Sequence, residues 1–158
     1  MFSRILLMVI AVASLWGCHS VKPSEQTPDV EYDLYLLIGQ SNMVGYAPLE
    51  AKDTAAIRGV WLLDDKGDII PATSPINRFS TIRFMGPTYY GLGSSFAKKV
   101  RHHTGRYILL VSNARGGSAI AEWQKESSYN FYSEAVRRTK QALSHHSING
   151  CAELCSGK

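Results

Sequence analysis

A serine lies directly after a short apolar run near the start of the chain. Leu34–Ile38 is continuous and apolar, as in a buried strand of a parallel sheet, and Gly39 ends it. Gln40, Ser41 and Asn42 follow, at the strand end where open α/β sheets place their ligands. If these residues open a helical turn, free backbone N–H groups and the helix dipole would stabilise the negative charge of an acyl-transfer reaction at the serine. The alternative is that Ser41 and Asn42 only cap the turn.

The turn at Gly39–Asn42 is the first of two predicted bends. The second, which has two consecutive glycines, lies further along the chain. Tyr107–Ser112 has the pattern of another buried strand, and Asn113–Ser118, which contains Gly116 and Gly117, follows it. A helix predicted over Pro87–His103 separates this strand from the first one. Parallel strands need such a crossover, so both strand ends are expected at one edge of the sheet. Paired glycines let backbone N–H groups approach a ligand closely, although a tight turn without a ligand is the alternative.

These segments resemble blocks of a known enzyme family. LLIGQSNMVG resembles the first block of the SGNH-type carbohydrate esterases, in the sialate O-acetylesterase and acetylxylan esterase group. Arg115-Gly116-Gly117, followed by Ile120 and Trp123, is similar to the Arg-Gly-Gly segment of that group, and Gly86-Pro87 with Ser95–Lys99 is similar to a block between them. The first block is not the G-x-S-x-G elbow of α/β-hydrolases, because Met43 replaces the second glycine.

The resemblance implies a fold, an activity and a set of roles. The fold would be an α/β three-layer sandwich with a parallel sheet, flavodoxin-like, as in SGNH hydrolases. The activity would be serine-dependent removal of O-acetyl groups from a carbohydrate, with no cofactor and no metal. Ser41 would be the nucleophile, its own N–H and that of Gly117 would bind the oxyanion, and Gly116 is the next choice of donor. Further candidates in the substrate loops are Gln40, Asn42, Asn113 and Arg115, of which the last two are expected mainly to organise the loop by hydrogen bonds.

The general base of that family has no counterpart in the sequence. Its later blocks resemble His-Gln-Gly-Glu and Asp-x-x-His, and neither occurs here. His102 and His103 are expected on the surface of a helix, and His145 and His146 follow the helix predicted over Asn130–His145, usually away from the strand-end edge. A serine without an adjacent base is a weak nucleophile. We therefore expect a truncated domain, incomplete at its C-terminus, with impaired activity and folding. A non-catalytic glycan-binding surface lipoprotein is the competing interpretation.

The N-terminal residues predict export and lipidation. Residues 1–17 have a basic start and an apolar run of signal-peptide length, and Leu15-Trp16-Gly17-Cys18 resembles the bacterial lipoprotein processing box. Ordinary signal cleavage and a retained membrane anchor are the alternatives. Lipidation of Cys18 would attach the protein to a membrane of the cell envelope, facing the periplasm or the cell surface. Residues 18–31 are polar and form a flexible tether, and residues 32–158 form the esterase domain.

Composition suits one globular domain and argues against a nucleic-acid partner. The chain has 158 residues, 45% hydrophobic and 19% charged, with a formal net charge of +4. The basic clusters Lys98–His103 and Arg137-Arg138 are interpreted as solvated helix faces, with Glu134 and Arg138 as an i,i+4 pair. A nucleic-acid binder would show a denser basic stripe with interleaved aromatic residues.

The remaining segments are predicted from turn signals. Gly59–Leu63 and Asp68–Pro71 form a hairpin around the turn Asp64–Gly67. Thr73–Met85 is a polar loop that, by resemblance, overhangs the active site; Arg78 or Arg83 would contact a carboxylate-bearing sugar there or be a plain surface charge. After Ile148-Asn149-Gly150 the sequence does not continue as a buried strand. Cys151 and Cys155 would form a small disulfide only if their backbone were helical or turned.

Overall fold

The computed structural model describes residues 31–84, 89–145 and 148–156, the last segment by its backbone only. The predicted signal peptide, Cys18 and nearly all of the tether lie outside these residues, as do Gly86-Pro87 and His146. Within the described residues, no helix combines the length and the apolar character needed to cross a membrane.

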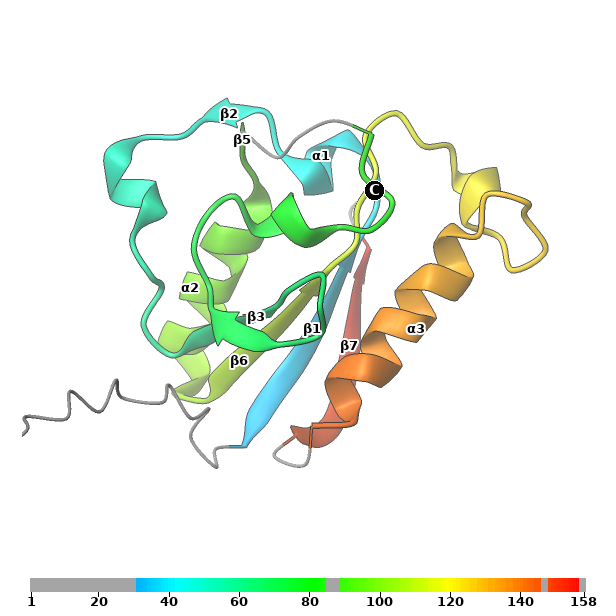
Figure 1. The fold of residues 1–158 in the computed structure, drawn as a ribbon. Helices are drawn as coiled ribbons and strands as arrows, with labels where there is room; N and C mark the ends of the chain where they lie inside the picture. The colour runs from blue at the N-terminus through cyan, green and yellow to red at the C-terminus, as the bar shows by residue number, and fades with distance from the viewer. Residues whose placement is uncertain (1–30, 85–88, 146–147, 157–158) are drawn as a thin grey trace, which may run out of the picture.

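A five-stranded sheet forms the centre of the fold (Figure 1). Its strands, in spatial order, are β4 (Ile69–Pro71), β3 (Val60–Leu63), β6 (Tyr107–Ser112), β1 (Tyr32–Ile38) and β7 (Ile148–Ser156). All neighbours pair in parallel except β3 and β4, which form the predicted antiparallel hairpin. The mostly parallel α/β sheet is thereby confirmed. The strand order differs from the flavodoxin order, in which the second strand lies next to the first, because β6 separates β3 from β1.

Two helices cover opposite faces of this sheet, so the core has two halves (Figure 1). Along β6, Ile108 and Leu110 contact the half on the side of α2 (Leu92–Thr104), whereas Leu109 and Val111 contact the half on the side of α3 (Phe131–Leu143). Such alternation is what a strand buried on both faces requires. Each fully buried aliphatic side chain contributes about 1.5–3 kcal/mol to folding.

Helix α2 begins later than the sequence predicts. Its first residue is Leu92, whereas the apolar pattern suggested a start at Pro87. Tyr89–Tyr90 instead forms the short strand β5, which pairs with β2 (Ala47–Pro48) in a separate two-stranded sheet. This pairing keeps the backbone extended up to the helix. Leu92 is consequently exposed, while Phe96 packs against the core.

Glycines allow two close approaches around α2. A Cβ on Gly93 would lie 2.8 Å from Leu37 Cδ1, so this glycine permits a close contact between α2 and the sheet. Gly91 packs against the short helix α1 (Ser41–Val44). There, a Cβ on Gly45 would lie only 2.3 Å from the Cα of Gly91. The serine-bearing turn is thus fixed against the start of α2.

Helix α3 contains a buried arginine that the sequence analysis placed on a solvated face. Arg138 is fully buried, and its guanidinium donates to the backbone oxygens of Asp64 and Leu63, both at 2.9 Å. Burial lowers the pKa of Arg138. The predicted ion pair of Glu134 with Arg138 is wrong, since Glu134 pairs with Arg137 at 2.7 Å. Arg138 therefore joins α3 to the end of β3.

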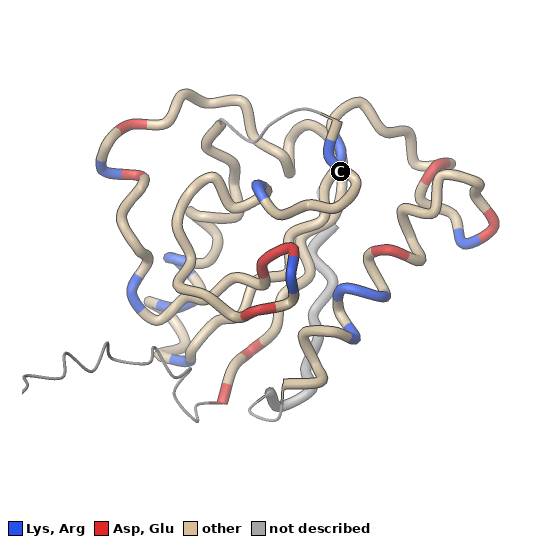
Figure 2. Tube along the Cα trace, in the orientation of Figure 1, with Lys and Arg blue, Asp and Glu red and all other residues tan. Residues whose placement is uncertain are grey.

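The turn between β3 and β4 is held by a single carboxylate. Asp64 Oδ1 accepts backbone N–H bonds from Lys66, Gly67 and Asp68 at 2.8–2.9 Å. An aspartate side chain that bonds the backbone just after it is the local feature that makes this segment a turn, as predicted. Figure 2 shows basic and acidic positions interspersed along the loops, whereas the charged residues of α2 are all basic.

The last strand continues past Gly150, where the sequence pattern did not predict a further buried strand. Residues 152–156 pair in parallel with β1 from Leu34 to Ile38, after a shift of register. An extended strand separates Cα atoms four residues apart by about 13 Å, well beyond disulfide reach. The condition stated for a Cys151–Cys155 disulfide, a helical or turned backbone, is therefore not met.

Candidate active site

The two predicted bends lie side by side at one edge of the sheet. The parallel pairing of β1 and β6 continues past both strands, because Asn113 N donates to Leu37 O and Arg115 N donates to Gly39 O, each at 2.9 Å. Ser41 follows two residues after Gly39, and the second glycine of the pair follows two residues after Arg115. These backbone bonds set the spacing of the bends.

The first bend presents Ser41 at the start of α1. The Gln40 carbonyl accepts hydrogen bonds from the backbone N–H groups of Met43 (3.0 Å) and Val44 (3.1 Å) and so closes the turn. Gln40 holds the N-cap position without a side-chain cap bond, so the interpretation of Ser41 and Asn42 as capping residues is not supported. Ser41 lines an open hollow of about 860 Å³. Within the described residues, neither its hydroxyl nor its N–H has a hydrogen-bond partner.

Hydrogen bonds hold the second bend on both sides of its two glycines. Ser118 Oγ donates to Arg115 O at 2.9 Å and accepts the Trp123 indole N–H at 2.9 Å. Gly117 is exposed and has a φ of +73°, the left-handed region that favours glycine. The N–H groups of Gly116 and Gly117 have no partner among the described residues. Two backbone donors of this bend are therefore available to a ligand.

Asn77 anchors the second bend from a distant loop. It lies in the 3-10 turn Ile76–Phe79 and is only 3% exposed. Its Oδ1 accepts from Ser112 Oγ (2.9 Å) and Ala114 N (3.0 Å), and its Nδ2 donates to Ala114 O (3.1 Å). Ser80 Oγ donates to the same carbonyl at 3.0 Å. Sequence analysis assigned no role to Asn77, because nothing local distinguishes it within a polar loop.

Asn113 and Arg115 both hold the same loop. Asn113 is fully buried, and its Oδ1 accepts from the N–H and the hydroxyl of Thr81 at 2.9 and 3.0 Å. Arg115 donates to the carbonyl of Ile82 at 2.8 Å, and its guanidinium lies 5.5 Å from the centre of the Phe84 ring. These contacts are those of loop-organising side chains.

Comparison with known proteins identifies the family. A family model described as a carbohydrate esterase, sialic acid-specific acetylesterase, matches residues 31–152. The chain belongs to this carbohydrate esterase family. It is 29% identical over 137 residues to the "Probable carbohydrate esterase At4g34215" of Arabidopsis thaliana, an alignment that covers 77% of this chain and 52% of that protein. The chain therefore spans about half the length of this curated relative. The family resemblance inferred from the sequence blocks is confirmed.

The fold agrees with a solved structure of the same Arabidopsis protein. The X-ray structure of AT4G34215 superimposes with a TM-score of 0.64 at 23% sequence identity. The superposition covers 82% of this chain and 58% of that chain. The superposition shows that this chain shares the α/β fold of the Arabidopsis protein.

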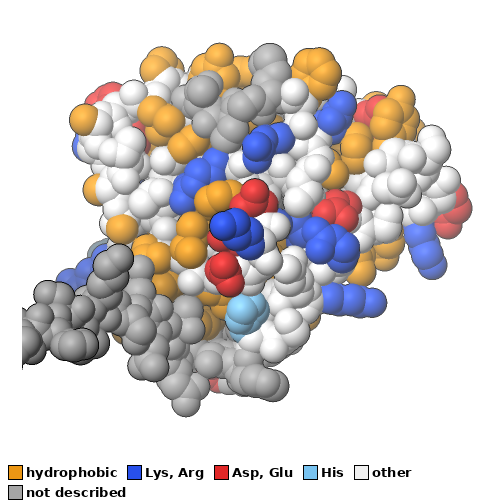
Figure 3. Space-filling view, in the orientation of Figure 1, with side chains coloured by type: hydrophobic (Ala, Val, Ile, Leu, Met, Phe, Trp, Pro, Cys, Tyr) orange, Lys and Arg blue, Asp and Glu red, His pale blue; other side chains and the backbone are white. Residues whose placement is uncertain are grey.

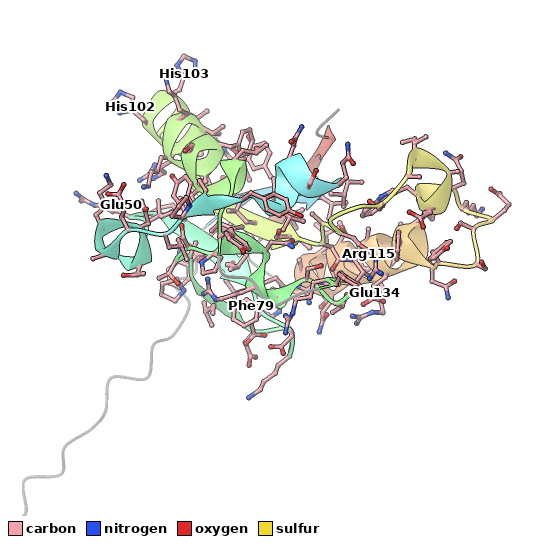
Figure 4. The ribbon with its side chains drawn as sticks, turned by 90° about the horizontal axis from the view of Figure 1, so that it is seen from above. Glu50, Phe79, His102, His103, Arg115 and Glu134 are labelled. Atoms are coloured by element: carbon pink, nitrogen blue, oxygen red, sulfur yellow. The ribbon has the colours of Figure 1, made fainter. Side chains whose placement is uncertain are left out.

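The described residues of this esterase family member place no histidine beside Ser41. His102 and His103 are exposed near the end of α2 (Figure 4). His145 follows α3 at the sheet edge where β1 begins, and its Nε2 lies 2.9 Å from Gly67 O. Among the described residues there is also no group of histidines, cysteines and carboxylates that could hold a metal ion.

Glu134, which Figure 4 labels, is the acidic side chain of α3 that reaches Thr81 in the overhanging loop. Its carboxylate accepts from Arg137 at 2.7 and 2.8 Å and from Thr81 Oγ1 at 2.7 Å. The Arg137 hydrogen bond, followed by that from Thr81, lowers the pKa of Glu134 against the opposing effect of burial. A carboxylate held in this way stays ionised at neutral pH and does not act as a general acid.

The two arginines of the overhanging loop have different surroundings. Arg78 donates to the backbone of Thr73 and Pro75, lies 4.5 Å from the centre of the Phe79 ring, and has a pKa lowered by burial. It is thus part of the loop's own structure. Arg83 is exposed, donates to the Arg78 carbonyl, and lines a second hollow.

Proposed function

We propose that this chain acts as a serine-dependent carbohydrate O-acetylesterase with Ser41 as the nucleophile. The observation that carries the proposal is the backbone bond from Arg115 N to Gly39 O, which sets the serine turn beside the glycine turn. Family membership supports the reaction class. An unpaired hydroxyl and unpaired N–H groups at adjacent strand ends are what acyl transfer to serine requires.

The reaction would proceed through an acetyl-enzyme. Ser41 Oγ attacks the acetyl carbonyl carbon and loses its proton to a base, while the N–H groups of Ser41 and Gly117, with Gly116 as a further donor, bind the oxyanion. Each such donor contributes about 3 kcal/mol to the transition state. The bond from the acetyl carbon to the sugar oxygen then breaks, and the sugar oxygen takes up a proton. Water hydrolyses the acetyl-enzyme by the same steps, and no cofactor is required.

The proton acceptor lies outside the described residues in this proposal. The histidines of the described part are either exposed on α2 or located at the opposite sheet edge. Activity of the chain with only the serine and backbone donors would be slow, because an unassisted hydroxyl is a weak nucleophile.

The lack of a histidine beside Ser41 among the described residues favours a second candidate function. The described residues form a crevice with a serine, backbone donors and polar loops. Without a histidine beside the serine, such a crevice suits a non-catalytic glycan-binding protein. Such a protein would bind an acetylated carbohydrate without cleaving it.

Hydrolysis of p-nitrophenyl acetate distinguishes the two functions. We expect the wild type to exceed the buffer rate and Ser41→Ala to fall to it, with Ser133→Ala, an exposed serine on α3, unchanged. Mass spectrometry of the quenched reaction should find the acetyl group on the peptide that contains Ser41. Equal rates for the wild type and Ser41→Ala would remove the esterase proposal and favour glycan binding.

We also propose that the protein is exported and anchored to the cell envelope through Cys18. The supporting observation is the apolar run of residues 5–15 followed by Gly17 and Cys18. The wild type should partition with membranes after expression in a bacterium, and Cys18→Ser should release it to the soluble fraction. Retention of Cys18→Ser in the membrane would contradict lipidation.

A further inference from the structure

An open hollow at the carboxyl end of α2 has only basic side chains among its charged lining residues. Lys98, Arg101 and His102 line it from the helix, and Arg58 lines it from the loop before β3. The three helical residues are spaced by three and four positions, so they share one face of α2. No acidic side chain of the described residues lines this hollow. We call these four residues the basic surface.

The packing of α2 fixes the direction of this face. The side of the helix that contacts the core consists of Phe96, Ala97 and Val100. The opposite side is turned toward solvent, where Lys98 and His102 are exposed, as is Arg58. A Cβ on Gly59 would lie 2.3 Å from Arg101 Nε, so the loop that carries Arg58 is in contact with the helix. The fold thus adds a distant arginine to the basic cluster that the sequence shows on α2.

Within the described residues, no carboxylate neutralises these cations. Arg58, Lys98 and Arg101 form no ion pair there. The acidic residues at the beginning of β1, Glu31 and Asp33, pair instead with Arg106, at N–O distances of 3.6 and 2.7 Å. Like charges held close together repel, and an anionic partner relieves that repulsion. The basic surface is therefore suited to a negatively charged partner.

The basic surface lies at the edge of the sheet where the chain enters the domain. α2 ends at Thr104, β6 begins at Tyr107, and Tyr107 pairs with Tyr32 at the start of β1. In Figure 1 the end of α2 and the start of β1 lie at the lower side of the view, and Figure 2 shows Lys and Arg positions around this end of α2. Figure 4 shows His102 at the outer end of the helix. The Ser41 bend follows β1, at the opposite edge of the sheet.

Charge, and not apolar surface, is what this edge offers. Figure 3 shows hydrophobic side chains gathered along the upper edge of the view, where β2 and β5 lie in Figure 1. Tyr107, which is 38% exposed at the edge of the basic surface, packs against the Arg101 guanidinium at 4.8 Å and the Tyr32 ring at 6.3 Å. Single-stranded nucleic acids stack their bases on free aromatic rings, and Tyr107 is already engaged. A membrane surface needs only the charge.

The position of the basic surface favours a bilayer as its partner. Residues 18–30 are polar, and a flexible chain of that length spans about 20 Å. With the proposed lipid on Cys18, the bilayer lies within that distance of Glu31 and of the basic surface. Lys and Arg clusters beside a membrane anchor bind anionic lipid headgroups.

We propose that the basic surface docks on the anionic headgroups of a bilayer and so directs the Ser41 bend away from the membrane. The orientation of the anchored protein rests on the proposed lipidation of Cys18. The affinity for anionic lipid needs neither the anchor nor the esterase reaction, because the charges of the folded domain supply it.

Partition of the full chain into vesicles tests this proposal, with Cys18→Ser to remove the covalent lipid. The measured quantity is the ratio of binding to vesicles with about one third phosphatidylglycerol over binding to pure phosphatidylcholine, so that apolar contributions from the N-terminal residues cancel. We expect a ratio of about a hundredfold at low salt, at about fivefold for each of the three Lys and Arg side chains. The ratio should fall steeply when the salt concentration rises from about 0.1 M to about 1 M.

A matched pair of double variants assigns the effect to the basic surface. Arg58→Gln with Lys98→Gln should lower the ratio by about 25-fold. Lys66→Gln with Lys125→Gln removes the same charge from exposed positions elsewhere and should lower it by less than about twofold. Both double variants should hydrolyse p-nitrophenyl acetate like the background chain, so their vesicle binding reports on the basic surface and not on the esterase proposal.

Three results would overturn the proposal. The first is equal binding to the two kinds of vesicle, and the second is an equal loss in the two double variants. The third is displacement of the protein from anionic vesicles by a single-stranded oligonucleotide at an equal phosphate concentration, with oligonucleotide binding that depends on Arg58 and Lys98. That result would make the surface a nucleic-acid site.

Discussion

At Gly117 the backbone conformation, and not the space around the residue, requires glycine. Its φ is +73°, and a Cβ placed there would meet no atom within 4 Å. We predict that Gly117→Ala lowers the free energy of unfolding by about 1 kcal/mol, since a left-handed conformation disfavours a side chain. If the residue leaves that conformation, its N–H turns away from the oxyanion, and esterase activity falls by up to about 100-fold. Urea unfolding and p-nitrophenyl acetate hydrolysis measure the two effects.

Gly105 provides a matched control for this prediction. It ends α2 with a φ of +69°, and a Cβ there would also meet no atom within 4 Å. Gly105→Ala should therefore cost the same stability without changing the hydrolysis rate. A rate loss shared by both variants would mean that stability, and not the direction of the Gly117 N–H, controls activity.

At the scale of single elements, the buried stripe of α3 explains why Arg138 was misplaced. Phe131, Ala135, Arg138 and Ala142 are buried and recur at intervals of four, three and four residues. The charges of Arg138 and its neighbour Arg137 are typical of a solvated helix face, and this pattern competes with the spacing of the apolar residues. The helical periodicity alone would have placed Arg138 on the core side, with a need for backbone acceptors.

We predict that Arg138→Ala lowers the free energy of unfolding by about 3 kcal/mol. The substitution removes two hydrogen bonds from a charged donor, so the carbonyls of Leu63 and Asp64 lose the guanidinium as their partner. Arg138→Lys should also destabilise, because one ammonium group does not reproduce the guanidinium fork. Arg137→Ala, which breaks an exposed ion pair, should cost less than about 1 kcal/mol in the same urea titration. Similar losses for both arginines would contradict the structural role of Arg138.

The loop that carries Asn77 is a separate element whose function is to hold the glycine bend. Asn77→Ala leaves Ala114 N and Ser112 Oγ without their buried acceptor, so we predict a loss of about 3 kcal/mol in unfolding free energy. In the folded variant, faster hydrogen exchange at Ala114 and Arg115 should show that the bend has loosened. Asn42→Ala, at an exposed position in the other bend, should leave both measurements unchanged.

At the scale of the molecule, local signals located the central strands, and distant contacts decided the rest. β1, β6 and the β3–β4 hairpin follow from apolar runs and turn residues that any short window shows. The extended conformation of Tyr89–Tyr90 depends on Ala47–Pro48, some forty residues away, and β7 depends on its pairing with β1. Ser41 and Gly117 were found as strand-end residues, whereas Asn77 acquires its contacts with Ser112 and Ala114 only when the fold brings its loop to the second bend.

The two halves of the core share β1 and β6, which leads to a prediction about the whole chain. Leu109 and Leu110 are adjacent, fully buried and directed into opposite halves. We predict that Leu109→Ala and Leu110→Ala each cost about 3 kcal/mol and that both variants unfold in one transition. Near- and far-ultraviolet circular dichroism should then give the same urea midpoint for each variant. Leu143→Ala, at a position 38% exposed, should shift the midpoint much less.

A single transition would have a consequence for the site. The bond from Arg115 N to Gly39 O exists only while β1 and β6 are paired, so sugar binding should be lost at the same urea concentration as the fold. Such cooperativity would also weigh against the expectation of impaired folding that the missing family blocks suggested. If the near- and far-ultraviolet spectra of either variant instead gave different urea midpoints, one face of the sheet would open while the other stays packed. In that case the two bends are held by one half of the core alone, and only substitutions in that half should abolish binding.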